Sequence, residues 1–170
     1  DIIAKSGNSG GSGGPHLHFE LRDSLEHPLN PLLYGFKDWI IDQAKPSIYN
    51  LFFYNLDEQR QFTASKKLKT SLVSSGNYKL NSTVLVNTQQ LGIGVHSVDL
   101  FTGTSNKNGV YEVKLYDNEN LNFHYRVDKL SFDNTKHVFS HCDYWQKKNH
   151  NNTVHKCFVE KGNKLPTYPL

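Results

Sequence analysis

Polar and apolar residues alternate clearly near the start of the chain. Residues 16–21 read HLHFEL, so His16, His18 and Glu20 would share one face of a strand and three apolar residues the other. Residues i and i+2 of a strand lie about 6–7 Å apart on the same face. The pattern therefore predicts a short strand that presents two histidines on one side.

A longer region from residue 48 onward is predicted to contain short strands separated by turns. The candidate segments are rich in Val, Ile, Tyr, Phe and Thr, which favour strands, and residues 75–77 and 106–109 have turn composition. Short strands at regular spacing predict an all-β fold, with a β-sandwich of immunoglobulin type. The candidate strands are 48–56, 66–73, 82–88, 91–101, 109–117, 120–127 and 154–160.

Composition supports this class and narrows the possible functions. Aromatic residues make up 12% of the 170 residues, which suits strands. The net charge is only +3 and the lysines are scattered, so no nucleic-acid partner is expected. No apolar run approaches the length of about 18 residues that a membrane-spanning helix needs.

A glycine-rich segment leads into the two histidines. Glycines at positions 10, 11, 13 and 14 permit backbone conformations with positive φ, and Pro15 is acceptable at the first position of a strand. His-x-His on a strand recurs in zinc sites, because a neutral imidazole nitrogen is a good zinc ligand. The same pair alone is more often simply the exposed polar face of an edge strand.

The wider motif is more specific. Residues 7–20, GNSGGSGGPHLHFE, resemble the closing motif of the lysostaphin/LytM-type zinc metallopeptidases, G-x-S-G-x-S-T-G-P-H-L-H-F-E. Asn30 and Pro31 resemble the Asn/Asp-Pro segment that follows it in this family, and Gly13 stands where Ser or Thr is commoner. The resemblance covers about the first 36 residues. Members of this family cut the peptide stems or cross-bridges of peptidoglycan.

The resemblance implies a role for each histidine. His18 matches the zinc ligand of the family, and His16 matches the histidine that polarises the metal-bound water or steadies the tetrahedral intermediate. Bound zinc lowers the pKa of water and polarises the scissile carbonyl. Glu20 is either a partner that holds an imidazole tautomer or, as we favour, a plain solvated carboxylate. The family implies a location in the cell envelope, periplasmic or extracellular, with peptidoglycan peptides as substrate.

The remaining zinc ligands are the main difficulty. A catalytic zinc usually takes three protein ligands, and this family supplies a His and an Asp from well upstream of the motif. The fifteen residues before His16 contain no histidine. We therefore expect the chain to be a fragment of a peptidase, with the other ligands upstream and no activity on its own.

Downstream residues offer one alternative source of ligands. His124 and Asp128 have a His-x-x-x-Asp spacing like that of the family's first ligand pair. They lie, however, in a predicted β-hairpin whose turn is 117–120 and whose apolar residues alternate with polar ones. We interpret both as part of the polar face of one strand rather than as zinc ligands.

A second alternative is formed by His141, Cys142, His155 and Cys157. Structural zinc prefers Cys and His ligands, but these pairs lack the compact C-x-x-C spacing. Sequence spacing alone therefore does not favour a zinc ion at these residues.

The two cysteines leave the redox state open. Val138, Cys142 and Trp145 recur at helical spacing and predict a helix, whereas Cys157 falls on a predicted strand. A disulfide between this helix and strand and two free or buried thiols are both compatible with the pattern.

The resemblance and the change of pattern together predict the domain organisation. Residues 1–36 would be the C-terminal part of the LytM-like zinc domain, 37–46 a linker, and 47–170 an immunoglobulin-like β-sandwich, possibly truncated at its C-terminus. The N-terminal part is expected to be loosely held or to dock through Phe36, Trp39 and Ile40. The alternative functions are a non-catalytic envelope protein that activates or scaffolds wall hydrolases and, less favoured, a surface adhesion module. The sandwich could bind the wall or an envelope partner.

Overall fold

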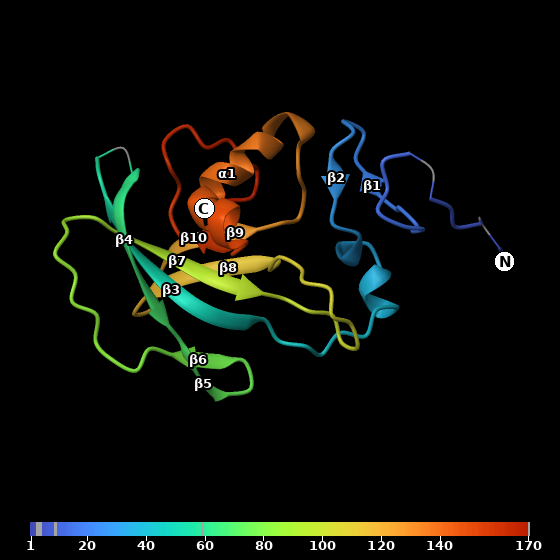
Figure 1. The fold of residues 1–170 in the computed structure, drawn as a ribbon. Helices are drawn as coiled ribbons and strands as arrows, with labels where there is room; N and C mark the ends of the chain where they lie inside the picture. The colour runs from blue at the N-terminus through green and yellow to red at the C-terminus, as the bar shows by residue number, and fades with distance from the viewer. Residues whose placement is uncertain (3–4, 9, 59, 170) are drawn as a thin grey trace.

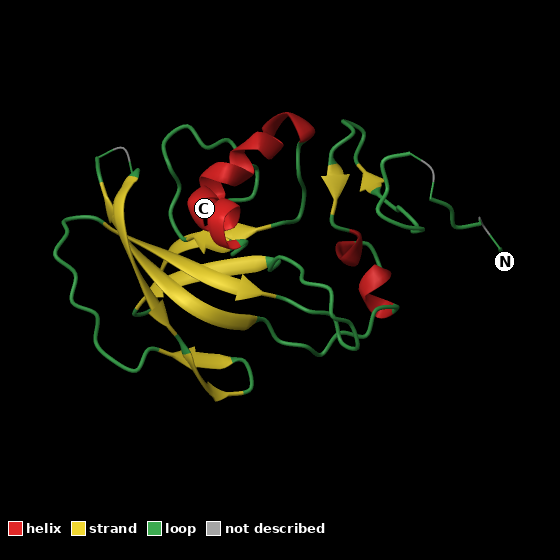
Figure 2. Ribbon diagram, in the orientation of Figure 1, coloured by secondary structure: helices red, strands yellow, loops and turns green. Residues whose placement is uncertain are grey.

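Strands form most of the regular structure in the computed structural model, which describes residues 1–2, 5–8, 10–58 and 60–169 (Figures 1 and 2). The sheets are antiparallel and the helices are short, so the fold belongs to the all-β class, as predicted. The strands are β1 Leu21–Arg22, β2 Pro28–Leu29, β3 Ser47–Leu56, β4 Phe62–Lys69, β5 Ser71–Ser74, β6 Asn77–Lys79, β7 Leu91–Val98, β8 Glu112–Asp117, β9 Asn120–Arg126 and β10 Val154–Lys156. The helical segments are η1 Pro31–Leu33, η2 Phe36–Asp38, η3 Phe132–His137, α1 Val138–His141 and α2 Tyr144–His150.

A four-stranded sheet in the order β10-β7-β3-β4 is the centre of the molecule. Phe52 and Tyr54 of β3 pair with Gly94 and Gly92 of β7, so all four lie on the same face. The aromatic rings cover the glycines and pack with Phe158. The long Tyr54 ring fits because β7 carries no side chain beneath it.

This close packing predicts the effect of enlarging a glycine. A Cβ atom at Gly94 would lie 2.8 Å from Cε2 of Tyr54 and 3.0 Å from Cγ1 of Val154. We expect Gly94→Ala to lower the free energy of unfolding by about 1–3 kcal/mol, and the melting temperature by about 2–4 °C for each kcal/mol. Thermal unfolding followed by circular dichroism measures this. Gly109→Ala is the control, because nothing lies within 4 Å of its added Cβ atom; equal losses in both variants would contradict the packing argument.

The other face of the sheet is covered by the β8–β9 hairpin. Phe123 and Tyr125 of β9 form a cluster with Cys157 that also contacts Ile93 and Val95 of β7. The hairpin agrees with its predicted pattern: Val113 pairs with Tyr125 and Leu115 with Phe123 across the two strands, and Asn118 in the turn has a φ of 52°. The predicted turn at 75–77 likewise joins β5 to β6, with Gly76 at a φ of 76°.

Three predicted elements differ from the structure. Residues 82–88 are not a strand, and the predicted strand 66–73 is divided at Thr70 into β4 and β5. The predicted helix around Cys142 is broken, because Cys142 is extended (φ −85°, ψ 147°) and pairs with His155 in an isolated antiparallel bridge. Cross-strand pairing with β10 therefore overrides helical spacing at this position.

The N-terminal segment, residues 10–46, docks through its backbone on the remainder of the described chain, residues 47–58 and 60–169, which we call the β-domain (Figure 1). Leu29 forms an antiparallel bridge with Lys129, Asn30 donates its backbone N–H to Asp128, and Leu130 donates its own to Pro28. The expected docking through Trp39 is wrong, since that side chain is 87% exposed. The N-terminal segment is instead attached by these three backbone contacts, which extend the antiparallel pairing of β2 to residues 128–130.

Candidate functional site

His16 lies where the glycine-rich segment folds back on the chain. It forms an isolated antiparallel bridge with Gly7, but residues 17–20 are not in a strand and β1 begins only at Leu21, so the predicted strand forms only in part. The His16 Nδ1 atom lies 2.8 Å from the Gly14 carbonyl oxygen and 3.1 Å from Ser12 Oγ. A carbonyl oxygen accepts only, so Nδ1 carries the hydrogen and Nε2 carries the lone pair. His16 is exposed, and in its neutral form Nε2 is the nitrogen with the available lone pair.

His18 is held by two charged neighbours. Its Nε2 atom lies 2.6 Å from Oε1 of Glu20, and Oε2 of Glu20 accepts from Nε of Arg22 at 2.9 Å. These contacts lower the pKa of Glu20, with Arg22 as the larger cause and His18 as the smaller. The Arg22 guanidinium in turn lies 5.1 Å from the centre of the Phe132 ring. Glu20 is thus not the plain solvated carboxylate that we favoured, but the partner of both residues.

The His18–Glu20 contact selects one imidazole nitrogen for binding. The carboxylate accepts the Nε2 hydrogen, so the Nδ1 lone pair of His18 is the one available to a metal ion. Metal-binding histidines commonly donate their second ring nitrogen to a carboxylate, which fixes the tautomer and orients the ring. The arrangement suits a ligand. Glu20 was one of two interpretations of the sequence, whereas the contact of Arg22 with Glu20 was found only in the structure.

The structure does not bring the other candidate ligands to His18. His124 bonds through Nε2 to Glu112 at 2.7 Å, while Asp128 bonds to Tyr111 and Arg126. His124 lies on the hairpin strand β9, as interpreted, although it is buried, whereas Asp128 lies two residues beyond the end of β9. Among the described residues, the one group of three possible metal ligands is elsewhere, at His141, Cys142 and His155.

Comparison with known proteins leaves the family open. No protein-family model, curated protein or solved structure matches the chain. The resemblance of residues 7–20 to the LytM-type motif therefore stays an interpretation of those residues. None of the helices in the described part of the chain has the length and apolar character needed to span a bilayer.

The second candidate site is a buried group of three side chains. His141 ends α1, Cys142 follows it, and His155 is the central residue of β10. One possible ligand atom from each lies within 4.8 Å of the others, so the group can hold a metal ion. The His141 Nε2 and His155 Nδ1 atoms are 3.0 Å apart. The end of α1 and strand β10 thus come together in a possible metal site that the spacing of these residues in the sequence did not favour.

Burial and aromatic contacts keep this group uncharged. His141 is fully buried, its ring stacks on Tyr125 at 3.9 Å, and burial lowers its pKa to about 3. His155 is 4% exposed, and burial lowers its pKa to about 4. Burial likewise raises the pKa of the Cys142 thiol to about 11. All three side chains are therefore neutral near pH 7.

The disulfide alternative is not realised, since both cysteines are free thiols. Cys142 pairs directly with His155, which lies two residues before Cys157 on β10 and its continuation. The register therefore points Cys142 toward His155. The Cys157 side chain packs with Phe123 and Tyr125 instead, and burial raises its pKa to about 12.

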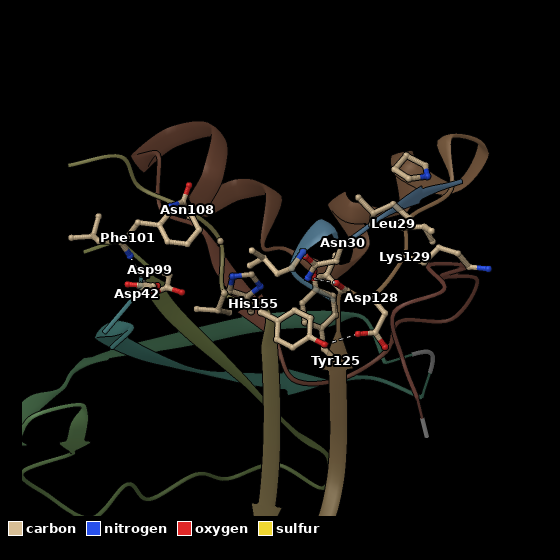
Figure 3. A pocket seen from close by; sticks show the side chains of 18 residues that line it. Leu29, Asn30, Asp42, Asp99, Phe101, Asn108, Tyr125, Asp128, Lys129 and His155 are labelled. Carbon is tan, nitrogen blue, oxygen red and sulfur yellow. Dashed lines mark hydrogen bonds between the residues drawn. The ribbon is translucent and has the colours of Figure 1, made fainter. Parts of the chain in front are cut away.

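A cavity of about 450 Å³ separates the N-terminal segment from the β-domain (Figure 3). Its lining includes Asn30 and Asp42 together with Asp99, Tyr125 and His155; Asp42 lies beside Asp99, and Asn30 lies nearer Tyr125 (Figure 3). Burial raises the pKa of Asp99, and the nearby charge of Asp42 adds to the effect. The Nε2 atom of His155 is buried without a hydrogen-bond partner among the described residues. The sequence did not predict the cavity or which residues line it, because the lining residues come from segments that are distant in the sequence.

Proposed function

We propose that the chain carries part of the catalytic centre of a zinc-dependent metalloendopeptidase that hydrolyses peptide bonds in peptidoglycan. In this proposal His18 is a zinc ligand and His16 is a catalytic residue. The supporting observation is the segment 7–20, whose motif resembles the LytM-type peptidases and whose His18 has Nε2 held by Glu20. An imidazole with one nitrogen held by a carboxylate suits a zinc ligand.

The chemistry follows from the two tautomers. Zinc, when bound, lowers the pKa of a water molecule and polarises the scissile carbonyl. His16, with its Nδ1 hydrogen held by Gly14, presents Nε2 as the nitrogen that takes a proton from the attacking water. As an imidazolium, it then stabilises the negative charge on the tetrahedral intermediate. Glu20 keeps the His18 ring oriented while Arg22 holds Glu20 in place.

The described residues supply too few ligands around His18 to complete a catalytic zinc site. A catalytic zinc takes three protein ligands and keeps one position for water or substrate. His18 belongs to no group of three possible ligands among the described residues, so the proposal places two further ligands outside them. We propose accordingly that residues 1–36 are the end of a LytM-like sheet, 37–46 a linker and 47–170 an immunoglobulin-like sandwich. The whole protein would work in the cell envelope, periplasmic or extracellular. The chain by itself would be inactive.

A non-catalytic envelope protein that activates or scaffolds wall hydrolases is the second candidate. The observation that favours it is the lack of a three-ligand group around His18 among the described residues. Intact His16 and His18 favour the enzyme, because a scaffold has no chemical need for two imidazoles behind a glycine-rich turn.

Zinc-dependent cleavage of peptidoglycan distinguishes the two functions. The full-length gene product is incubated with purified cross-linked peptidoglycan, with and without a zinc chelator, and released muropeptides are separated and weighed by mass spectrometry. We expect new amino termini from peptide-bond cleavage, which chelation abolishes and zinc restores. His18→Ala should remove both zinc and cleavage, whereas His150→Ala, an exposed histidine on α2, should change neither. Cleavage that persists in His18→Ala would exclude the proposed ligand, and no cleavage by the zinc-loaded protein would favour the scaffold.

A further inference from the structure

We propose that His141, Cys142 and His155 form a second zinc site, within the β-domain and independent of His16 and His18. The three side chains come from two elements: His141 and Cys142 from the end of α1, and His155 from β10. Their possible ligand atoms already lie within 4.8 Å of one another. A bound ion would join the helical segment to the edge of the central sheet, and with three protein ligands its fourth position would be left to water or another small ligand.

The distances agree with a single tetrahedral ion. Zinc binds imidazole nitrogen at about 2.0–2.1 Å and thiolate sulfur at about 2.3 Å, so two nitrogen ligands of one ion lie about 3.3 Å apart. The His141 Nε2 and His155 Nδ1 atoms are 3.0 Å apart in the structure. Two ligand atoms are thus near the required separation. The possible ligand atoms of all three residues lie within 4.8 Å of one another, compared with about 3.5 Å for sulfur and nitrogen on one zinc ion. Side-chain rotation closes a difference of this size without a change of the backbone.

The backbone holds the three residues together before any ion binds. Cys142 and His155 are direct partners in an antiparallel bridge, which places their side chains on the same face. The next residue, Asp143, donates its backbone N–H to the Val154 carbonyl oxygen and accepts from Tyr54 Oη on the other face. This two-sided attachment fixes the position of Cys142, so little conformational entropy is lost on binding.

The neighbours of His141 form the outer contacts that a metal-bound histidine needs. Its Nδ1 atom lies 3.2 Å from the Tyr168 hydroxyl, and that hydroxyl accepts from the Asn163 side chain at 2.9 Å. The Tyr125 ring stacks on the imidazole and limits its rotation. Partners of this kind orient a ligand and typically change metal affinity 10- to 100-fold when they are removed.

Zinc binding requires the loss of one proton from the group and a defined hydrogen position on each imidazole. The Cys142 thiol loses one proton to solvent and binds as a thiolate. In the metal-bound form His141 carries its hydrogen on Nδ1 and His155 on Nε2, so that His141 Nε2 and His155 Nδ1 present the lone pairs. The His141 Nδ1 hydrogen is then donated to the Tyr168 oxygen, across the contact of 3.2 Å that the structure already has. Both imidazoles stay neutral and each contributes one lone pair. One thiolate and two imidazoles are a donor set that zinc prefers over magnesium or calcium.

Cobalt(II) tests the site directly, because it replaces zinc and absorbs light when bound to thiolate. The 170-residue chain is titrated with Co²⁺ under reducing conditions, and the thiolate-to-cobalt and tetrahedral cobalt bands are recorded. We expect one equivalent to bind and zinc to displace it. Cys142→Ser should abolish the thiolate band, while Cys157→Ser, the matched buried thiol outside the group, should retain it. His18→Ala should also retain it, which separates this site from the proposed peptidase centre, and Tyr168→Phe should weaken binding about 10- to 100-fold.

A second measurement covers the case in which the Cys142→Ser protein does not fold. The unmodified chain is treated with iodoacetamide with and without zinc, and the labelling of each cysteine is measured by mass spectrometry of peptides. We expect zinc to slow labelling of Cys142 relative to Cys157. A wild-type chain that gives no thiolate–cobalt band, or whose Cys142 labels equally fast with zinc, would show that the histidines are only a hydrogen-bonded core pair.

Discussion

His16→Ala should leave zinc bound to the full-length protein and slow the cleavage of peptidoglycan about 10²- to 10⁴-fold. The reason is that His16 donates Nδ1–H to Gly14 and offers Nε2 for proton transfer, whereas the ligand role is assigned to His18. A methyl group in place of the imidazole removes the proton acceptor but no ligand. Zinc content by elemental analysis and the initial rate of muropeptide release measure the two effects separately.

The comparison with His18→Ala makes this assignment testable. That variant should lose zinc and cleavage together, because a ligand is removed. Glu20→Gln provides an intermediate case, since the amide keeps the size of the side chain but weakens its bond to His18, and we expect about a 10- to 100-fold weaker zinc affinity. Full activity in His16→Ala would refute its catalytic role. Loss of zinc in His16→Ala with its retention in His18→Ala would reverse the two roles.

Asp143→Ala should lower the free energy of unfolding of the β-domain by about 2–4 kcal/mol. One carboxyl oxygen accepts from the Gln146 backbone N–H and caps α2, and the other accepts from the Tyr54 hydroxyl at 2.9 Å. Loss of the cap costs about 1 kcal/mol, and an unsatisfied buried hydroxyl costs a further 1–3 kcal/mol. Tyr54 is fully buried, so water cannot replace its lost partner.

Urea unfolding of matched variants resolves the two contributions. Asp143→Asn keeps an acceptor for the cap and a polar group opposite Tyr54, so it should lose less than Asp143→Ala. Tyr54→Phe removes only the hydroxyl and leaves the helix cap in place. The double variant Tyr54→Phe, Asp143→Ala should lose less than the sum of the single variants, because both remove the same bond. Additive losses would show that the two residues act independently.

The two candidate metal sites differ in how they are built. His16 and His18 come from one local segment whose motif can be recognised by reading along the chain. His141, Cys142 and His155 come together only because β10 pairs with the segment that follows α1. The first site is exposed and needs ligands from outside the described residues, whereas the second is enclosed and already has three.

The sequence by itself determined what depends on neighbours within one element. The alternation of Val113 and Leu115 with polar residues, and the Asn118 turn, were enough to predict the β8–β9 hairpin. The same holds for the all-β class, since periodicity and turn chemistry act over a few residues.

Tertiary structure decided everything that depends on pairing between distant segments. Cys142 has helical spacing in the sequence, yet it is extended because its backbone pairs with His155, and both Cys142 and Cys157 are free thiols. Contacts between distant segments also explain why the N-terminal segment docks through Leu29 rather than Trp39. They likewise place Tyr168 against His141. Residues this far apart carry no shared periodicity, so only the packing of the sheet against its covering segments brings them together.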